Sequence, residues 1–316
     1  MINNFLTVGQ QVLILFLLIA VGFICSRKGL INGIQAKGMT NLVMYVVTPS
    51  VMIHSFQRNF DKTLFFGLLL AILSAVLIHL VLILLSKIFL HDEKEEREKV
   101  YRFSAIFSNC GFMSLPLQSA ILGDIGTFYG SAYIAVFNII AWTYGVALME
   151  GKKDSSREFH PLLTLRSLLL NPGIFGVVIG LILFFASIKL PQVIAMPVSY
   201  MAALNTPLPM IIIGYHLSQA DPGMFLKEKN QYITFALRLL VLPLLTVFSL
   251  CLLHVPAEVA ISTVIATSAP TAALCTMFAD RFSLDTKLSA TIVSLSTILS
   301  IITMPFIIGL AQGLIS

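Results

Sequence analysis

Ten long apolar blocks dominate this 316-residue sequence, and they constrain its fold more than any motif does. Each block approaches the roughly 20 residues that an α-helix needs to cross the hydrocarbon core of a bilayer. Because the blocks are continuously apolar and do not alternate, they predict membrane-spanning helices and not barrel strands. Only 11% of all residues are charged, whereas soluble domains carry about 25%. The approximate limits are 5–25, 38–57, 63–86, 100–121, 128–149, 168–187, 193–217, 231–253, 257–279 and 288–312.

The lysines and arginines segregate to one side of these expected helices. Sixteen of the 20 lie in the loops after helices 1, 3, 5, 7 and 9, three lie on the opposite side, and Arg238 falls inside helix 8. Lys and Arg are enriched in cytoplasmic loops. The sequence therefore predicts an all-α integral membrane protein of the cell membrane, with ten transmembrane helices, both termini outside and the odd-numbered loops in the cytoplasm.

Two halves of the chain share small features at one spacing. A separation of 158 residues relates the following pairs: Thr48-Pro49 with Thr206-Pro207, and Gly22 with Gly180. Five helices are an odd number, so a duplicated five-helix unit enters the membrane upside down the second time, as in many transporters. We therefore expect a first five-helix repeat at 1–150, a short cytoplasmic linker at 151–167 and an inverted repeat at 168–316.

Blocks 4 and 9 each carry a proline among small polar residues near their middle. Proline removes a backbone donor and clashes with the preceding turn, so it favours a break in each helix. A half-helix that starts inside the membrane offers free N–H groups and a positive dipole end, which bind anions. The alternative is a simple kink, with the hydroxyls bonded back to the helix. The candidate substrate-binding residues are Ser108, Asn109, Gly111 and Ser114 near Pro116, and Thr267, Ser268 and Thr271 near Pro270.

Other residues are candidates for a supporting role. Arg238, inside block 8, either attracts an anionic substrate or extends its long side chain to the membrane interface. The remaining supporting candidates are Thr48, Pro49, Asn205, Thr206 and Pro207. No acidic residue lies near the middle of a block, which argues against a carboxylate relay for protons and a carboxylate-built sodium site. The charge run His91–Lys99 is typical of a solvated loop.

Block 4 resembles the auxin efflux carrier family in the stretch from Asn109 through Met113 and Pro116 to Gly123. Trp142, Asn171-Pro172, Ile179-Gly180, Ala269-Pro270 and Phe278-Ala279 extend the resemblance over nearly the whole chain. It implies two inverted five-helix repeats whose helices 4 and 9 cross at Pro116 and Pro270. It also implies carriage of carboxylates, with Asn109 as the substrate contact. The segment at 150–167 is short where many plant members have a long one. The size and composition resemble bacterial members, several of which are linked to malate or malonate.

These patterns predict a secondary transporter that moves a small organic anion, such as malate, by alternating access. A sodium-coupled bile-acid-type symporter is the alternative, followed by a channel. The sequence holds no phosphate-binding loop and no hydrolase motif, so we expect no enzyme activity. We expect no cofactor, no metal site and no nucleic-acid partner. The expected partners are the carboxylate and the lipid bilayer, while a proton or sodium as coupling ion and a homodimer stay open.

Overall fold

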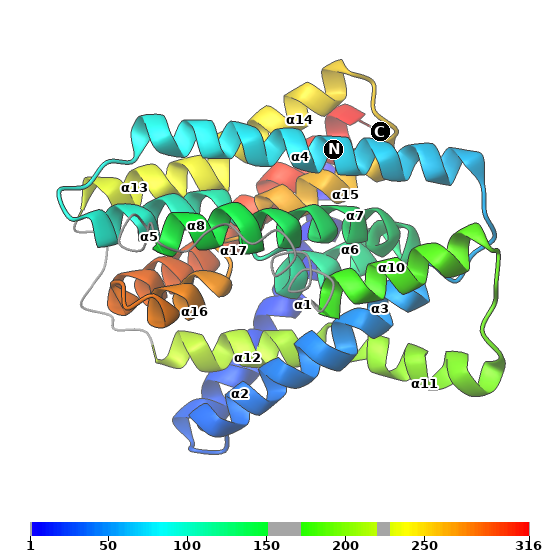
Figure 1. The fold of residues 1–316 in the computed structure, drawn as a ribbon, viewed down its shortest axis with the longest axis horizontal. Helices are drawn as coiled ribbons and strands as arrows, with labels where there is room; N and C mark the ends of the chain where they lie inside the picture. Colours follow the sequence, from blue (N-terminus) through cyan, green and yellow to red (C-terminus); the bar gives the residue numbers. More distant parts are fainter. Residues whose placement is uncertain (1, 151–171, 220–227, 316) are drawn as a thin grey trace.

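The computed structural model describes residues 2–150, 172–219 and 228–315, and within these ranges the regular structure is helical apart from one isolated backbone bridge. The expected linker at 151–167 lies outside the described residues. Figure 1 shows α4 along one side of the bundle and α2 and α12 at the opposite side. Helices α5, α6, α7, α15 and α17 lie between them in this view. The prediction of an all-α integral membrane protein is confirmed at this level.

Six helical stretches among the described residues are long and apolar enough to cross a membrane. They are α1 (Ile2–Arg27), α4 (Lys62–Phe89), α7 (Asp124–Ile140) with α8 (Val146–Glu150), α11 (Gln192–Ala203) with α12 (Pro207–Ser218), α13 (Lys229–Ala236) with α14 (Leu242–Leu252), and α17 (Thr286–Ile315). The other helices are shorter. They are α2 (Gly33–Leu42), α3 (Thr48–Ser55), α5 (Glu95–Ile106), α6 (Leu115–Leu122), α10 (Pro172–Phe185), α15 (Ala257–Ser268) and α16 (Leu274–Arg281).

Three π-helical turns come directly before an X-Pro pair, and the prolines explain them. The turns are Val43–Val47 before Thr48-Pro49, Cys110–Ser114 before Leu115-Pro116, and Leu237–Val241 before Leu242-Pro243. A proline ring clashes with the carbonyl four residues earlier. In each case the residue before proline instead donates its N–H to the carbonyl five residues earlier. The wider turn therefore keeps these helices hydrogen-bonded through the proline.

Helix α1 packs against α12 at backbone contact because glycines face each other. A Cβ atom on Gly22 would lie 2.2 Å from the carbonyl oxygen of Ile211, and one on Gly214 would lie 2.1 Å from the carbonyl oxygen of Ile19. Small residues let membrane helices approach in this way, since lipid supplies no hydrophobic drive for their association. The hydroxyls of Ser26 and Ser218, 2.6 Å apart, add a hydrogen bond at one end of the contact.

We expect Gly22→Ala to destabilise the protein by about 1–3 kcal/mol, the usual cost of overpacking, because its new methyl group would meet rigid backbone. Gly9→Ala is the matched control on the same helix, since nothing lies within 4 Å of a Cβ atom there. Thermal melting of the purified variants measures the difference. Equal melting temperatures for the two variants would refute the close α1–α12 contact.

Helix α5 begins inside the charge run that the sequence suggested was a loop. Glu95, Glu96 and Glu98 occupy its first turn, where carboxylates favour the positive end of the helix dipole. Ion pairs one turn apart join Lys99 to Glu95 at 2.9 Å and Arg102 to Glu98 at 2.8 Å. The expectation of a loop is therefore wrong from Glu95 onward, because these charges complete a helix.

Candidate functional site

Two helices break in the interior of the bundle. Helix α5 ends at Ile106, and the chain becomes helical again at Cys110. Helix α15 ends at Ser268, and α16 starts at Leu274. Ala269 is extended, with φ −64° and ψ 149°, as expected of a residue before proline. We call the two non-helical segments, 107–109 and 269–273, the paired breaks.

The paired breaks hold each other by backbone hydrogen bonds. The Asn109 N–H donates to the Pro270 carbonyl at 2.7 Å, and the Ala272 N–H donates to the Phe107 carbonyl at 2.9 Å. Between these bonds, Ser108 and Thr271 face each other as an isolated antiparallel pair. Backbone groups inside a membrane need partners within the protein. The two segments supply them to each other, so neither break could keep this form alone.

Four helix ends meet at the paired breaks. The carbonyl ends of α5 and α15 are the negative ends of two helix dipoles. The amino ends of the helix starting at Cys110 and of α16 carry the corresponding positive character. This arrangement separates a carbonyl-rich side, suited to a cation, from an N–H-rich side, suited to an anion.

Arg238 occupies the carbonyl-rich side. Its side chain is fully buried, and Nη1 donates to the carbonyls of Ala105 at 3.3 Å and Ile106 at 3.1 Å. Nη2 donates to the carbonyl of Thr267 at the end of α15. The expectation that Arg238 extends to the interface is wrong, because its guanidinium caps both helix ends.

Asn109, Ser108 and Gly111 lie at or next to the break at 107–109. The Asn109 side-chain amide forms no hydrogen bond with any residue that the structure describes, although the residue is only 7% exposed. Across the same described ranges, the buried Ser108 hydroxyl makes no hydrogen bond of good geometry, although the Tyr133 hydroxyl and the Cys110 thiol neighbour it. Open space surrounds Gly111, since nothing lies within 4 Å of an added Cβ atom. Unpaired donors beside open space are what a polar ligand needs.

The other candidate hydroxyls serve the structure. Thr267 donates to the Val264 carbonyl at 3.0 Å and Ser268 to the Ile265 carbonyl at 3.1 Å, each within its own helix. Ser114 donates across to Ile265 at 3.3 Å, and the Thr271 hydroxyl donates to Ser104 at 3.1 Å. The hydroxyls of Thr267 and Ser268 thus follow the simple-kink alternative, whereas Ser114 and Thr271 join the broken helices to each other.

Pro116 and Pro270 occupy different positions. Pro270 lies inside a break and supplies the carbonyl that Asn109 binds. Pro116 lies seven residues after Asn109, near the start of α6, inside a stretch that is helical from Cys110 to Leu122. The sequence pattern predicts a helix break at both prolines. Of the two, only Pro270 lies in a non-helical segment.

The supporting candidates divide between two places. Thr48 and Pro49 begin α3, and Pro49 packs against Gly176 of α10. Asn205 and Thr206 form the turn between α11 and α12, and Pro207 begins α12. Helix α12 contacts the Cys110–Ser114 turn, so this second group adjoins a helix that packs next to the paired breaks.

Two residues near the paired breaks have no strong sequence signal. Tyr133 of α7 is buried, and its hydroxyl neighbours Ser108 and Arg238 without a hydrogen bond of good geometry. The His79 ring lies 5.2 Å from the Tyr133 ring, with Nδ1 2.7 Å from the Ala75 carbonyl. Their only signal is a polar group in the middle of an apolar block, which many packed residues share.

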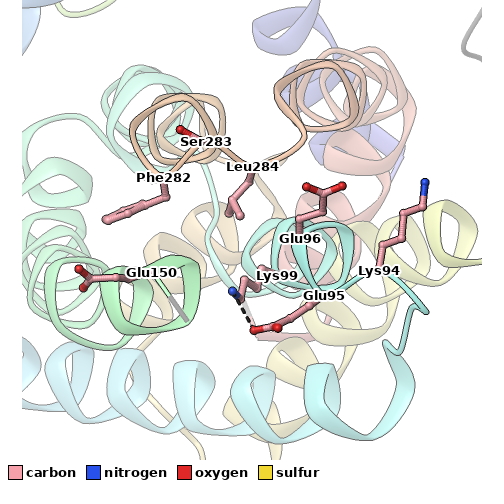
Figure 2. Close-up of a pocket in the computed structure, with 8 residues that line it drawn as sticks. All are labelled: Lys94, Glu95, Glu96, Lys99, Glu150, Phe282, Ser283 and Leu284. Atoms are coloured by element: carbon pink, nitrogen blue, oxygen red, sulfur yellow. Dashed lines mark ion pairs between the residues drawn. The ribbon is translucent and has the colours of Figure 1, made fainter. Parts of the chain in front are cut away.

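A charged hollow of about 680 Å³ lies at the far end of α5 from the breaks. Figure 2 shows Glu150 and Phe282 on one side of it and Lys94 and Glu96 on the other. Lys99, the lining residue furthest along α5, lies seven residues before Ile106, so about 10 Å of helix separates the hollow from the paired breaks. Aromatic rings fill the space along α5 and α16, with centroids 4.4 Å apart for Phe103–Phe107 and 5.4 Å apart for Phe103–Phe278. The hollow is therefore a separate feature from the paired breaks.

Membrane transporters commonly have discontinuous helices like those that meet at the paired breaks, and comparison with known proteins gives the class and the family. A model described as membrane transport protein, that of the auxin efflux carrier family, matches residues 7–308. The chain belongs to this family, which is a transporter family and not an enzyme family. The chain is also similar to an uncharacterized transporter of Methanocaldococcus jannaschii, with 23% identity over 222 residues, 66% of this chain and 68% of the relative.

Proposed function

We propose that the protein carries a small organic anion, such as malate, across the cell membrane by alternating access, and binds the carboxylate at the paired breaks. The observation that carries this proposal is the unpaired Asn109 amide next to two half-helix amino ends. An amide offers two donors without a charge of its own. Dipole ends and a neutral amide hold a carboxylate moderately, which suits a carrier that must also release it.

The pattern of charge near the site favours an anion over a cation. Arg238 is buried there, and its neighbours Tyr133 and His79 bring no carboxylate. Three ion pairs occur among the described residues: Arg97 with Glu228, Lys99 with Glu95, and Arg102 with Glu98. All three lie away from the paired breaks, so none of them neutralises Arg238. A fixed positive charge with no acidic partner lowers the energy of an incoming anion.

The ten-helix inverted repeat is part of this proposal, and the spacing of the helices supports it. The same separation of 162 residues relates Glu95 to Ala257, Ile106 to Ser268 and Asp124 to Thr286, which are helix starts or ends. The glycine contacts repeat as well. Gly22 contacts Gly214, and Phe56 contacts Gly180. A shift of 158 positions takes Gly22 to Gly180 and Phe56 to Gly214, so the two contacts are equivalent in the two halves.

Two five-helix repeats place both termini on the same side of the membrane, and the charge distribution makes this the outer side. A reporter that is active only in the cytoplasm should therefore be active when fused after Asp154 and silent when fused after Ser316. The 16-to-3 division of Lys and Arg between the loops is the reason for this expectation. Equal reporter activity at both positions would contradict the odd number of helices per repeat.

Transport assays in proteoliposomes test the anion specificity. We expect external malate to drive saturable counterflow of labelled malate, and we expect malonate to compete. The matched neutral diamides should not compete, because they lack the charge that the amino ends of the helices attract. Equal competition by acids and diamides would remove the electrostatic basis of the site. Flux without saturation or counterflow would favour a channel, and flux only with sodium would favour the bile-acid-type symporter.

A further inference from the structure

We propose that Arg238 occupies the place of a coupling cation, so that the carrier binds its organic anion without sodium. This inference rests on the proposed function, since it concerns what accompanies the anion at the paired breaks. In transporters with discontinuous helices, the carbonyl ends of half-helices and unwound carbonyls commonly coordinate the coupling ion. Here those carbonyls already have a cationic partner from the chain itself.

The contacts of Arg238 are those that a bound cation would make. Its guanidinium reaches three carbonyl oxygens, two at the end of α5 and one at the end of α15. The side chain is fully buried and comes from the π-helical turn Leu237–Val241. That turn precedes Pro243, so the proline-dependent widening of the helix places the arginine in contact with both breaks.

A count of charge shows why no further cation is needed. Each helix end carries about half an elementary charge, so the two carbonyl ends contribute about −1 and the two amino ends about +1. Arg238 adds a full positive charge next to the carbonyl ends. The paired breaks therefore have a net charge of about +1 before the substrate arrives, and this balances the one substrate carboxylate that binds there; the second carboxylate of malate is outside this count. Without Arg238 the same anion would need a cation at the carbonyl ends.

The groups that face Arg238 leave its charge uncompensated. Tyr133 from α7, Cys110 from the second half of the broken helix and His79 from α4 are its electrostatic neighbours. None of these is a carboxylate, and within the described ranges Arg238 makes no ion pair. The Nε atom of Arg238 has no hydrogen-bond partner there either. The positive charge is thus available to balance the substrate.

The test compares sodium with choline on the purified full-length chain. For the wild type we expect equal melting temperatures in sodium chloride and choline chloride, and equal malate counterflow in proteoliposomes made with either salt. In Arg238→Ala the carbonyl ends lose their cation, and we expect counterflow in choline to fall roughly five- to hundredfold. Sodium or millimolar guanidinium should restore part of the counterflow and raise the melting temperature, because either cation can occupy the vacated position.

Two further variants separate this role from general stabilisation. Arg281→Ala removes an exposed arginine at the end of α16 and should show no response to sodium or guanidinium. Arg238→Lys keeps the positive charge and should stay independent of sodium even where its melting temperature falls. Melting measurements on both variants need no knowledge of the substrate.

The possible results separate the inference from the proposed function. Stabilisation of the wild type by sodium over choline would overturn the inference and leave organic anion transport intact. Malate counterflow that requires sodium would also overturn it, and would favour the sodium-coupled alternative while still showing transport of an organic anion. An Arg238→Ala protein that melts lower but gains nothing from sodium or guanidinium would also overturn it. Absence of malate counterflow in both salts would contradict the proposed substrate, while the melting comparison would still decide the role of Arg238.

Discussion

Asn109→Ala is expected to weaken carboxylate binding by roughly 1–3 kcal/mol, a five- to hundredfold loss of affinity, while the protein still folds. The reason is that the Asn109 backbone joins the two breaks, whereas its side-chain amide is unused by the described structure. Alanine keeps the backbone hydrogen bond to Pro270 and removes only the amide. Asn109→Asp should reduce binding further, because it puts a negative charge where the carboxylate lies.

Binding and thermal melting measured on the same purified variants check this prediction. Asn138→Ala is the matched control, since the Asn138 amide donates to the Ile134 carbonyl of its own helix at 3.0 Å. We expect the control to keep its affinity for malate. An Asn109→Ala protein with a lower melting temperature and unchanged affinity would mean that Asn109 packs the helices and does not touch substrate.

Pro270→Ala is expected to reduce transport at least about tenfold, which corresponds to 1.4 kcal/mol, with a smaller effect on folding. Proline in a helix interior costs about 3 kcal/mol, and alanine removes this barrier to extending α15 past Ser268. Extension would draw the Pro270 position into a helix and break the hydrogen bonds that join it to Asn109 and join Ala272 to Phe107. The half-helix amino end that we propose binds the anion would then be lost.

Pro116→Ala is the matched comparison, and it should cost less transport than Pro270→Ala. Pro116 lies in a stretch that is already helical from Cys110, so alanine there has no break to close. Counterflow rates normalised to the amount of folded protein in the proteoliposomes measure both effects. A larger loss for Pro116→Ala than for Pro270→Ala would mean that the kink at α6, and not the break at 269–273, supports transport.

The sequence predicted the broad fold because the bilayer imposes a simple pattern. Apolar blocks of spanning length are visible without knowledge of packing. The described residues of these blocks are helical apart from the paired breaks at 107–109 and 269–273, the turn at 204–206 and a few residues at block ends. The π-helical turns were not predictable in the same way. Three of them precede prolines such as Pro49 and Pro243, and a fourth, Ala141–Gly145, has no proline after it. Whether a proline kinks, breaks or widens a helix depends on which neighbours can take the freed carbonyls.

The candidate site was predicted in part, and its errors have one cause. Position along a helix indicates that Asn109 and Pro270 lie at mid-block, but it does not indicate which helix from the other half lies beside them. The sequence therefore leaves open whether Arg238 extends to the membrane interface. In the structure, the helix formed by α13 and α14 places the Arg238 guanidinium against carbonyls of α5 and α15. The hydroxyls of Thr267 and Ser268 bond within their own helix, an option that the sequence left open.

The most direct test of the central claim is protection of a cysteine at position 111 by substrate. Gly111 faces open space beside Asn109, so Gly111→Cys, in a chain whose four native cysteines are replaced by serine or alanine, places a thiol at the proposed site. Gly38→Cys, which also has nothing within 4 Å of its Cβ atom, serves as the control. We expect malate to slow labelling at position 111 by a small thiol reagent and the matched diamide to leave it unchanged, with no effect of either compound at position 38. The contradicting result would be labelling at position 111 that malate does not slow, measured at concentrations where malate raises the melting temperature of the same variant. Malate would then bind the protein elsewhere, and not at the paired breaks.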